Sequence, residues 1–125
     1  MNMNTEFLLC GDCKSVLLKI PGTVPNAPEG TAPLAAGVVE ASHEKHVPVA
    51  VRHADTVSVD VGSTLHPMTA EHYILWILLR TDTGFHIRTL APGQEPKADF
   101  VLAKQEKPVT VYAMCNIHGL WQADM

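Results

Sequence analysis

Residues 72–80 read HYILWILLR, and this stretch decides the fold. The run from Tyr73 to Leu79 is apolar throughout, shows no sustained helical period and is far too short to cross a membrane. A strand that is apolar on both faces is typical of the centre of a sheet, where both faces are covered. The next stretch, RTDTGF at residues 80–85, predicts a hairpin turn. Residues 72–80 are therefore expected to form the central strand of a layered β-protein.

Further strand-like runs surround this one and are bounded by Pro, Gly and Asp. They are AGVVEA (36–41), VPVAVRH (47–53), DTVSVDV (55–61), FHIRTLA (85–91), ADFVLA (98–103) and PVTVYAMC (108–115). DTVSVDV alternates polar and apolar side chains, as a half-buried strand does. About seven short strands in roughly ninety residues are typical of an immunoglobulin-like antiparallel β-sandwich. The predicted fold class is all-β.

The N-terminal part of the chain has a different composition. FLLCGDCKSVLLKI, residues 7–20, is a short apolar stretch around Cys10 and Cys13. PGTVPNAPEGTAP, residues 21–33, is rich in Pro and Gly and predicts an extended linker or long loop. We therefore expect a short Cys-x-x-Cys segment with its linker over 1–33 and the β-sandwich domain over 34–125.

Composition excludes several classes of function. With 125 residues, 46% of them hydrophobic, the chain can build one domain with a real core. The net charge of -4 and the lack of a basic stripe argue against a nucleic-acid partner, and an anionic substrate would need a local positive charge. There is no long apolar run and no signal sequence, so we expect a cytoplasmic protein without membrane contact. The odd number of cysteines, three, favours thiols or metal thiolates over a disulfide framework.

Histidines gather in three predicted loops at the ends of strands. They occur in SHEKHVPV (His43 and His46), LHPMTAEHY (His66 and His72) and CNIHG (Cys115 with His118). Loops at one end of a sandwich converge, and His with Cys is a ligand set suited to iron, copper or zinc. The sequence therefore predicts a metal site. We assign ordinary surface, hydrogen-bonding or packing roles to the remaining candidates, which are His43, His53, His86, Met68 and Trp76.

The number and type of the candidate ligands help to choose between copper, zinc and iron. A blue-copper site needs an axial Met, and Met125 is a poor one because it stands at the frayed end of the sequence. A structural zinc site closes its sphere with four ligands and leaves one candidate over. A set of five such ligands suits an iron with one open face.

Three segments carry a resemblance to a known family. EKHVPV (44–49), GSTLHPMTAEHYI (62–74) and CNIHGLW (115–121) resemble, in the same order, the signature segments of the desulfoferrodoxin and neelaredoxin family of non-haem iron superoxide reductases. The match covers roughly residues 36–123. It implies one mononuclear iron with an axial thiolate and an open sixth position, and reduction of superoxide to hydrogen peroxide.

The resemblance also implies roles for single residues. The metal ligands would be His46, His66, His72, Cys115 and His118, with the Cys115 sulfur on the axis. Lys45 would steer superoxide toward the opening, and Glu44 would close over the open site and take part in proton delivery. Asn116 and neighbouring backbone amides would hydrogen-bond the Cys115 sulfur.

One departure from the family concerns the N-terminal segment. Two-iron members hold a rubredoxin-like iron with four cysteines, but no cysteine occurs here between Lys14 and Met114. That second iron is therefore not expected. Cys10 and Cys13 could be a relic, a reducible disulfide, or half of a site shared between subunits.

The resemblance implies an external electron donor such as rubredoxin, and a dimer or tetramer. A second reading of the same sandwich remains open, namely a metal-binding electron carrier or sensor, of blue-copper or iron type, without turnover.

Overall fold

The computed structural model describes residues 5–20 and 27–125. The chain divides into two compact units, the first ending at Ala35 and the second spanning Ala36–Met125. Residues 21–26 of the predicted linker lie outside the described residues. Within the part of the chain that the structure describes, no helix is long and apolar enough to span a membrane.

The first unit is a small antiparallel sheet. It consists of β1 (Glu6–Cys10), β2 (Val16–Lys19) and β3 (Thr31–Leu34) in the order β2-β1-β3. Phe7 and Leu8 of the central strand are buried. The expectation of linker through residue 33 is therefore wrong for 31–33, because this segment pairs with β1. Pro33 is tolerated there because β3 is an edge strand, where a missing N–H costs no ladder hydrogen bond.

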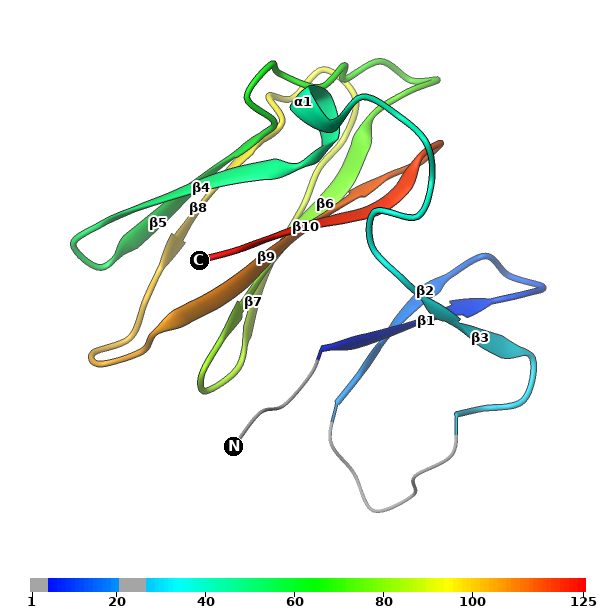
Figure 1. Ribbon diagram of the computed structural model, residues 1–125, viewed down its shortest axis with the longest axis horizontal. Helices are drawn as coiled ribbons and strands as arrows, with labels where there is room; N and C mark the ends of the chain where they lie inside the picture. Colours follow the sequence, from blue (N-terminus) through cyan, green and yellow to red (C-terminus); the bar gives the residue numbers. More distant parts are fainter. Residues whose placement is uncertain (1–4, 21–26) are drawn as a thin grey trace. The chain divides into compact units, whose positions relative to one another are not determined.

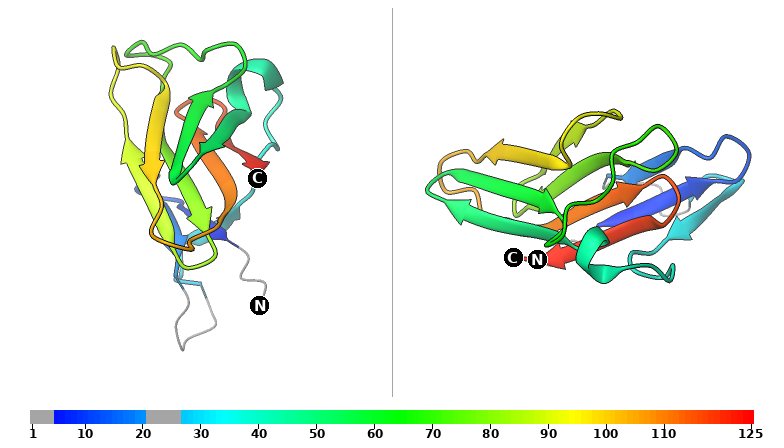
Figure 2. Two further views of the ribbon diagram at one scale, coloured as in Figure 1. Left: turned by 90° about the vertical axis from the view of Figure 1, so that its left-hand side faces the viewer. Right: turned by 90° about the horizontal axis from the view of Figure 1, so that it is seen from above.

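The second unit is an antiparallel β-sandwich, as the sequence predicts (Figure 1). One sheet has the order β4-β5-β8 and the other β10-β9-β6-β7, and Figure 2 shows both from two further sides. A single helical turn, α1 (His43–His46), precedes β4. The strands are β4 (Pro48–His53), β5 (Thr56–Val61), β6 (Ile74–Thr81), β7 (Phe85–Thr89), β8 (Lys97–Val101), β9 (Pro108–Cys115) and β10 (Gly119–Asp124).

The core lies between the two sheets. In β5 the side chains of Val57, Val59 and Val61 are buried, so the alternation predicted for this strand is confirmed. β6 lies between β9 and β7 and is buried along most of its length, as expected for the central strand. Each fully buried aliphatic side chain contributes roughly 1.5–3 kcal/mol. The sandwich is thus held by the strands that lead into the predicted metal-binding loops.

Two predictions about the strands are wrong. Residues 36–41 form no strand, and their apolar Val38 is 69% exposed. Gly37 has a φ of 70°, which turns the chain instead of extending it. The last strand is not β9 but β10, which pairs back on β9 through a turn closed by Gly119 at a φ of 77°. The sandwich therefore has seven strands, β4 to β10, which is the number predicted. The predicted strand at 36–41 is absent, and β10 takes its place in the count.

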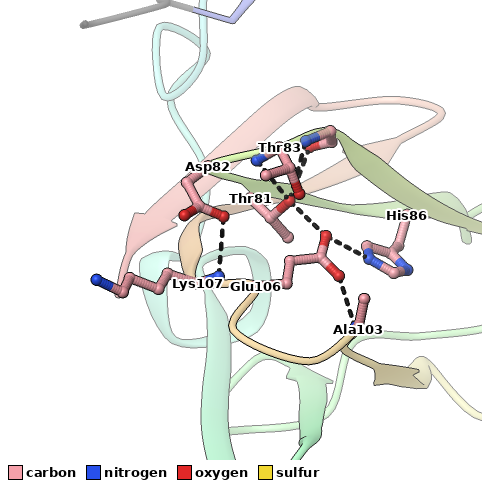
Figure 3. Close-up of polar contacts among 8 residues, drawn as sticks. Thr81, Asp82, Thr83, His86, Ala103, Glu106 and Lys107 are labelled. Atoms are coloured by element: carbon pink, nitrogen blue, oxygen red, sulfur yellow. Dashed lines mark hydrogen bonds and ion pairs between the residues drawn. The ribbon is translucent and has the colours of Figure 1, made fainter.

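A buried carboxylate braces the hairpin between β6 and β7 (Figure 3). Glu106 accepts hydrogen bonds from the Thr81 hydroxyl at 2.5 Å, from the Ala103 N–H at 2.8 Å and from His86 Nε2 at 3.0 Å. These hydrogen bonds, led by that of Thr81, lower the pKa of Glu106 to about 2, against the opposing effect of burial. The expected hydrogen-bonding role of His86 is thereby confirmed.

The ionised Glu106 is expected to stabilise the sandwich in a pH-dependent way. Its folded pKa lies below the ordinary value, so the contribution is complete above about pH 4.5 and is lost as the pH falls toward about 2. Glu106→Gln should therefore lower the free energy of unfolding by about 2–3 kcal/mol at neutral pH. The difference from the parent protein should shrink below pH 4.5, which denaturant unfolding at several pH values measures.

Asp82→Asn is the matched control for this prediction. Asp82 is an exposed carboxylate in the turn between β6 and β7 and accepts the Lys107 N–H at 2.9 Å. Its replacement should change the free energy of unfolding by well under 1 kcal/mol. A Glu106→Gln effect that stays constant down to pH 2 would contradict the assignment of the stabilisation to the ionised carboxylate.

Candidate metal centre

The first of the three ligand-bearing segments is α1. The turn ends at Val47 because the residue before Pro48 is driven out of the helical region, and Val47 has φ -70° and ψ 119°. His46, at its end, is 3% exposed. Its Nδ1 donates to the Ser42 carbonyl at 2.6 Å. A carbonyl can only accept, so Nδ1 carries the hydrogen and Nε2 presents a lone pair.

The second segment is the loop between β5 and β6, which carries His66 and His72. The His66 N–H donates to the Val61 carbonyl at 2.7 Å, so the backbone of His66 is held at the end of β5. Its Nδ1 donates to the Pro67 carbonyl at 2.7 Å, which again leaves a lone pair on Nε2. His66 is 3% exposed. His72 lies two residues before β6, in the same loop.

The third segment is the β9–β10 turn with Cys115 and His118. Cys115 is fully buried, and its sulfur accepts the His118 N–H at 3.4 Å. The prediction that a neighbouring backbone amide bonds this sulfur is thereby confirmed, but the prediction that Asn116 does so is wrong. Its side chain instead accepts the Tyr73 N–H and donates to the Glu71 carbonyl, each at 3.0 Å. Asn116 therefore fastens the backbone on both sides of His72 to the third segment.

The four imidazoles form a closed ring of neighbours. Passing from His46 to His66, His72, His118 and back, the ring centroids are 4.7, 4.5, 5.0 and 4.9 Å apart. Neighbouring planes cross at 77–86°, while the diagonal from His46 to His72 is 6.2 Å. This square arrangement directs the rings toward one centre.

The sulfur of Cys115 lies beside this ring. One ligand atom each from His46, His66, His72 and Cys115 all lie within 4.8 Å of one another. His118 stands outside that group of four residues, but its Nδ1 is 3.1 Å from His46 Nε2 and 3.9 Å from the Cys115 sulfur. The structure thus brings the five predicted ligands to one place.

Two features of the nitrogen atoms in this cluster favour a metal ion between them. His46 Nε2 and His66 Nε2 are 3.2 Å apart, and both present lone pairs because their Nδ1 atoms donate to carbonyls. Among the described residues, His72 Nε2 is buried without a hydrogen-bond partner. Lone pairs that face one another repel unless a proton or a metal ion lies between them, and a buried nitrogen without a partner is costly. The donor set therefore fits a metal ion.

Burial disfavours the alternative in which these rings are protonated. Loss of solvent lowers the pKa of His66 to about 4, reinforced by His46 and His72. Burial also lowers the pKa of His46 and His72, with further contributions from His118 and Lys45. Neutral imidazoles at neutral pH are the form that binds metals.

Glu44 and Lys45 lie on the exposed side of α1. Glu44 Oε2 accepts the Ser42 hydroxyl at 2.9 Å, so its carboxylate is held at the start of the turn. The Lys45 ammonium helps to lower the pKa of His46 and His72, which places its positive charge within electrostatic reach of the cluster. Neither residue belongs to the group of ligand atoms.

Sequence reasoning missed two supporting residues. Trp121 is buried, lies 5.0 Å from the His46 ring and donates from Nε1 to the His118 carbonyl at 3.0 Å. Gly62 is packed so tightly under α1 that an added Cβ would lie 2.5 Å from the Glu44 carbonyl oxygen. The signals were present: Trp121 closes the CNIHGLW segment, and Gly62 directly follows β5.

The residues set aside in the sequence lie elsewhere. His43 and His53 are exposed, and Met68 packs against the core, as expected. Trp76 is half-buried in β6. None of them contributes a ligand atom to the cluster.

The chain is thus a small β-sandwich protein whose loops gather four imidazoles and a thiol, a donor set that fits a metal ion. A family model described as Desulfoferrodoxin matches residues 38–124, so the chain belongs to the desulfoferrodoxin family. It is 34% identical to a desulfoferrodoxin of Clostridium acetobutylicum over the full length of both chains. It is also 39% identical to a superoxide reductase of Thermococcus kodakarensis, over 66% of this chain and 86% of that protein.

A solved structure agrees over nearly the whole chain. The superoxide reductase from Treponema pallidum has a TM-score of 0.80 to this structure at 33% identity. The likeness covers 98% of this chain and 100% of that one. The similarity therefore extends beyond the sandwich to the N-terminal unit.

Proposed function

We propose that the chain is a superoxide reductase, which reduces superoxide by one electron to hydrogen peroxide. The observation that carries the proposal is the cluster of neutral imidazoles and one buried thiol, in which lone pairs face one another at 3.2 Å. One sequence relative and one solved structure with the same fold are named superoxide reductases. The enzyme class is an oxidoreductase.

The proposed ligands are His46, His66, His72, His118 and Cys115, and the proposed metal is a single iron. When bound in its ferrous state, iron supplies the electron and an open position for the substrate. A donor set of imidazoles with one thiolate suits iron better than magnesium or calcium, which prefer oxygen ligands. Copper and zinc share the preference for these ligands, so metal analysis is part of the test.

Hydrogen bonds within the chain orient the donor atoms of the proposed ligands. The Ser42 and Pro67 carbonyls hold hydrogens on the Nδ1 atoms of His46 and His66, so their Nε2 atoms are free to bind. The His118 N–H points at the Cys115 sulfur, which stabilises negative charge on that atom. Burial lowers the pKa of His46, His66 and His72, which favours their neutral form, and the Cys115 side chain is fully buried.

Lys45 and Glu44 act on the substrate side in this proposal. Superoxide is an anion and the chain has a net charge of -4, so the Lys45 ammonium supplies the attraction that the whole protein lacks. The exposed Glu44 carboxylate takes protons from water and passes them to the reduced product. Ser42 holds this carboxylate through Oε2, within one turn of His46.

Lys45→Ala is expected to slow the capture of superoxide about tenfold and to weaken its dependence on ionic strength. Metal content should not change, since Lys45 is not among the ligand atoms. Pulse radiolysis or stopped flow at several salt concentrations measures both effects. Lys104→Ala is the matched control, because it removes the same charge from an exposed lysine outside the cluster. An unchanged capture rate in Lys45→Ala would remove this residue from the mechanism.

An anaerobic stoichiometry experiment tests the proposed function. The protein is loaded with ferrous iron, superoxide is added, and hydrogen peroxide, ferric iron and oxygen are quantified. We expect about one peroxide and one ferric iron per superoxide, with little oxygen released. Oxygen release as in dismutation would contradict the proposal. Absence of iron oxidation by superoxide would favour the electron carrier or sensor.

The remaining partners belong to the same proposal. An external one-electron donor such as rubredoxin must reduce the centre again after each turnover. Homo-oligomerisation and a cytoplasmic location stay predictions from the sequence.

A further inference from the structure

We infer that Cys10 and Cys13 form a thiol–disulfide exchange site in the N-terminal unit, which takes two electrons from a dithiol. The two residues are joined by a disulfide across the turn between β1 and β2. Neither residue belongs to the metal-binding cluster. The third cysteine, Cys115, is fully buried in the other unit. The inference does not depend on the proposed superoxide chemistry.

The turn is held by its backbone without help from the disulfide. The Cys10 N–H donates to Ser15 at 2.9 Å and the Lys14 N–H donates to Cys10 at 3.0 Å, in both cases to the carbonyl. The Gly11 N–H donates to the Gly30 carbonyl at 2.9 Å, which ties the turn to the chain just before β3. Reduction would therefore leave both thiols close together, and the bond could form again.

The disulfide also contributes little to the stability of the fold. The two cysteines are only three positions apart, and closing so short a loop restricts the unfolded chain far less than closing a long one. A bond that stabilises little and sits in a preformed turn is better suited to exchange than to holding the fold.

The two sulfur atoms differ in access and in environment. Cys13 is exposed together with its neighbours Gly11 and Asp12, whereas Cys10 is half-buried at the end of β1. The Cys13 N–H donates to the Cys10 sulfur at 3.2 Å. An incoming thiolate therefore reaches Cys13 first, and the same N–H stabilises Cys10 as the leaving thiolate.

The exchange balances as two displacements. The first thiolate of the dithiol forms a bond to the Cys13 sulfur, and the bond between the two cysteines breaks to release the Cys10 thiolate. The second thiolate of the reductant then attacks its own partner sulfur and releases Cys13. The dithiol is oxidised to a disulfide, the pair is reduced by two electrons, and both released thiolates take protons from water.

The test uses the full-length, iron-loaded protein in buffers of reduced and oxidised dithiothreitol. Samples are alkylated with N-ethylmaleimide at neutral pH, while the protein is folded, and the peptide that contains both cysteines is then weighed by mass spectrometry. We expect a reversible transition that follows a two-electron couple, with unchanged absorption of the metal centre and no alkylation of Cys115 in the folded protein. Reduction that needs denaturant, or failure of the disulfide to form again, would overturn the inference.

Single variants test the order of attack. Cys10→Ser leaves the exposed Cys13, which should form a mixed disulfide with glutathione disulfide about tenfold faster than Cys10 does in Cys13→Ser. Equal rates would overturn the assigned order. A further assay adds Zn²⁺ to the reduced parent protein. Protection of both thiols, with one ion bound per two chains, would make the pair half of a shared metal site and would overturn the exchange role.

Discussion

Cys115→Ser is expected to abolish the sulfur-to-iron charge-transfer absorption of the oxidised, iron-loaded protein. Superoxide reduction should fall by about a hundredfold or more, since loss of a supporting group around a metal ligand alone costs 10–100-fold. A serine hydroxyl keeps its proton at neutral pH and gives the metal far less electron density than a thiolate. Visible absorption spectroscopy and the anaerobic peroxide assay measure the two effects.

The controls for this variant lie within the same chain. Cys13→Ser removes an exposed cysteine of the N-terminal unit and should keep the band and the rate. Thermal unfolding shows whether Cys115→Ser still folds, because the residue is fully buried. A band that persists in folded Cys115→Ser would exclude Cys115 as a ligand. His118→Ala is the complementary variant, because it keeps the thiol. The sulfur-to-iron absorption band should therefore persist in this variant, at a shifted wavelength.

Gly62→Ala is expected to have the second-largest effect, although its side chain is a single methyl group. The added Cβ would lie 2.5 Å from the Glu44 carbonyl oxygen and 2.8 Å from that of Val47, and both atoms belong to the backbone around α1. The Thr64 N–H donates to the same Glu44 carbonyl at 3.0 Å, so this hydrogen bond must break or move with α1. Overpacking of this kind lowers the free energy of unfolding by about 2–3 kcal/mol.

The displacement should also reach the metal centre, because α1 carries His46. We expect weaker iron binding, measured by competition with a chelator, together with the loss of stability. Gly84→Ala is the matched control, since an added Cβ there meets nothing within 4 Å. That variant should stay within about 0.5 kcal/mol of the parent protein. Unchanged stability and iron affinity in Gly62→Ala would contradict this prediction, because α1 would then move aside without loss of free energy.

The sandwich and the gathering of the four histidines with Cys115 could be predicted because their signals are local. Polar and apolar residues alternate along β5, and β6 is apolar on both faces. The order of the residues alone therefore indicates which side chains are buried. The ligands stand beside Pro67, Pro48 or the end of a strand, where loops must begin. In contrast, 36–41 has strand-like residues but receives no partner strand, and strand pairing is a property of the whole fold.

The supporting contacts of the site could not be predicted for a related reason. The side chain of Asn116 has a single amide group. Whether this group bonds the Cys115 sulfur or the backbone beside His72 depends on the path of the β5–β6 loop. The tight contact of Gly62 with α1 likewise joins segments that the sequence separates. Such contacts follow from the packing of loops, which carries no periodic signal in the sequence.

The hydrogen bond from Thr64 to Glu44, and those of Asn116 with the backbone beside His72, tie the three ligand-bearing segments together through protein atoms alone. In the proposed enzyme these bonds favour one arrangement of the donor atoms, whichever divalent ion is bound. Several divalent metals should therefore bind to the same donor atoms. Affinity for such ligands rises from iron to copper whatever the enzyme needs. Correct loading then depends on which ion the cell supplies during folding, and overexpression in zinc-rich medium should yield well-folded, inactive protein.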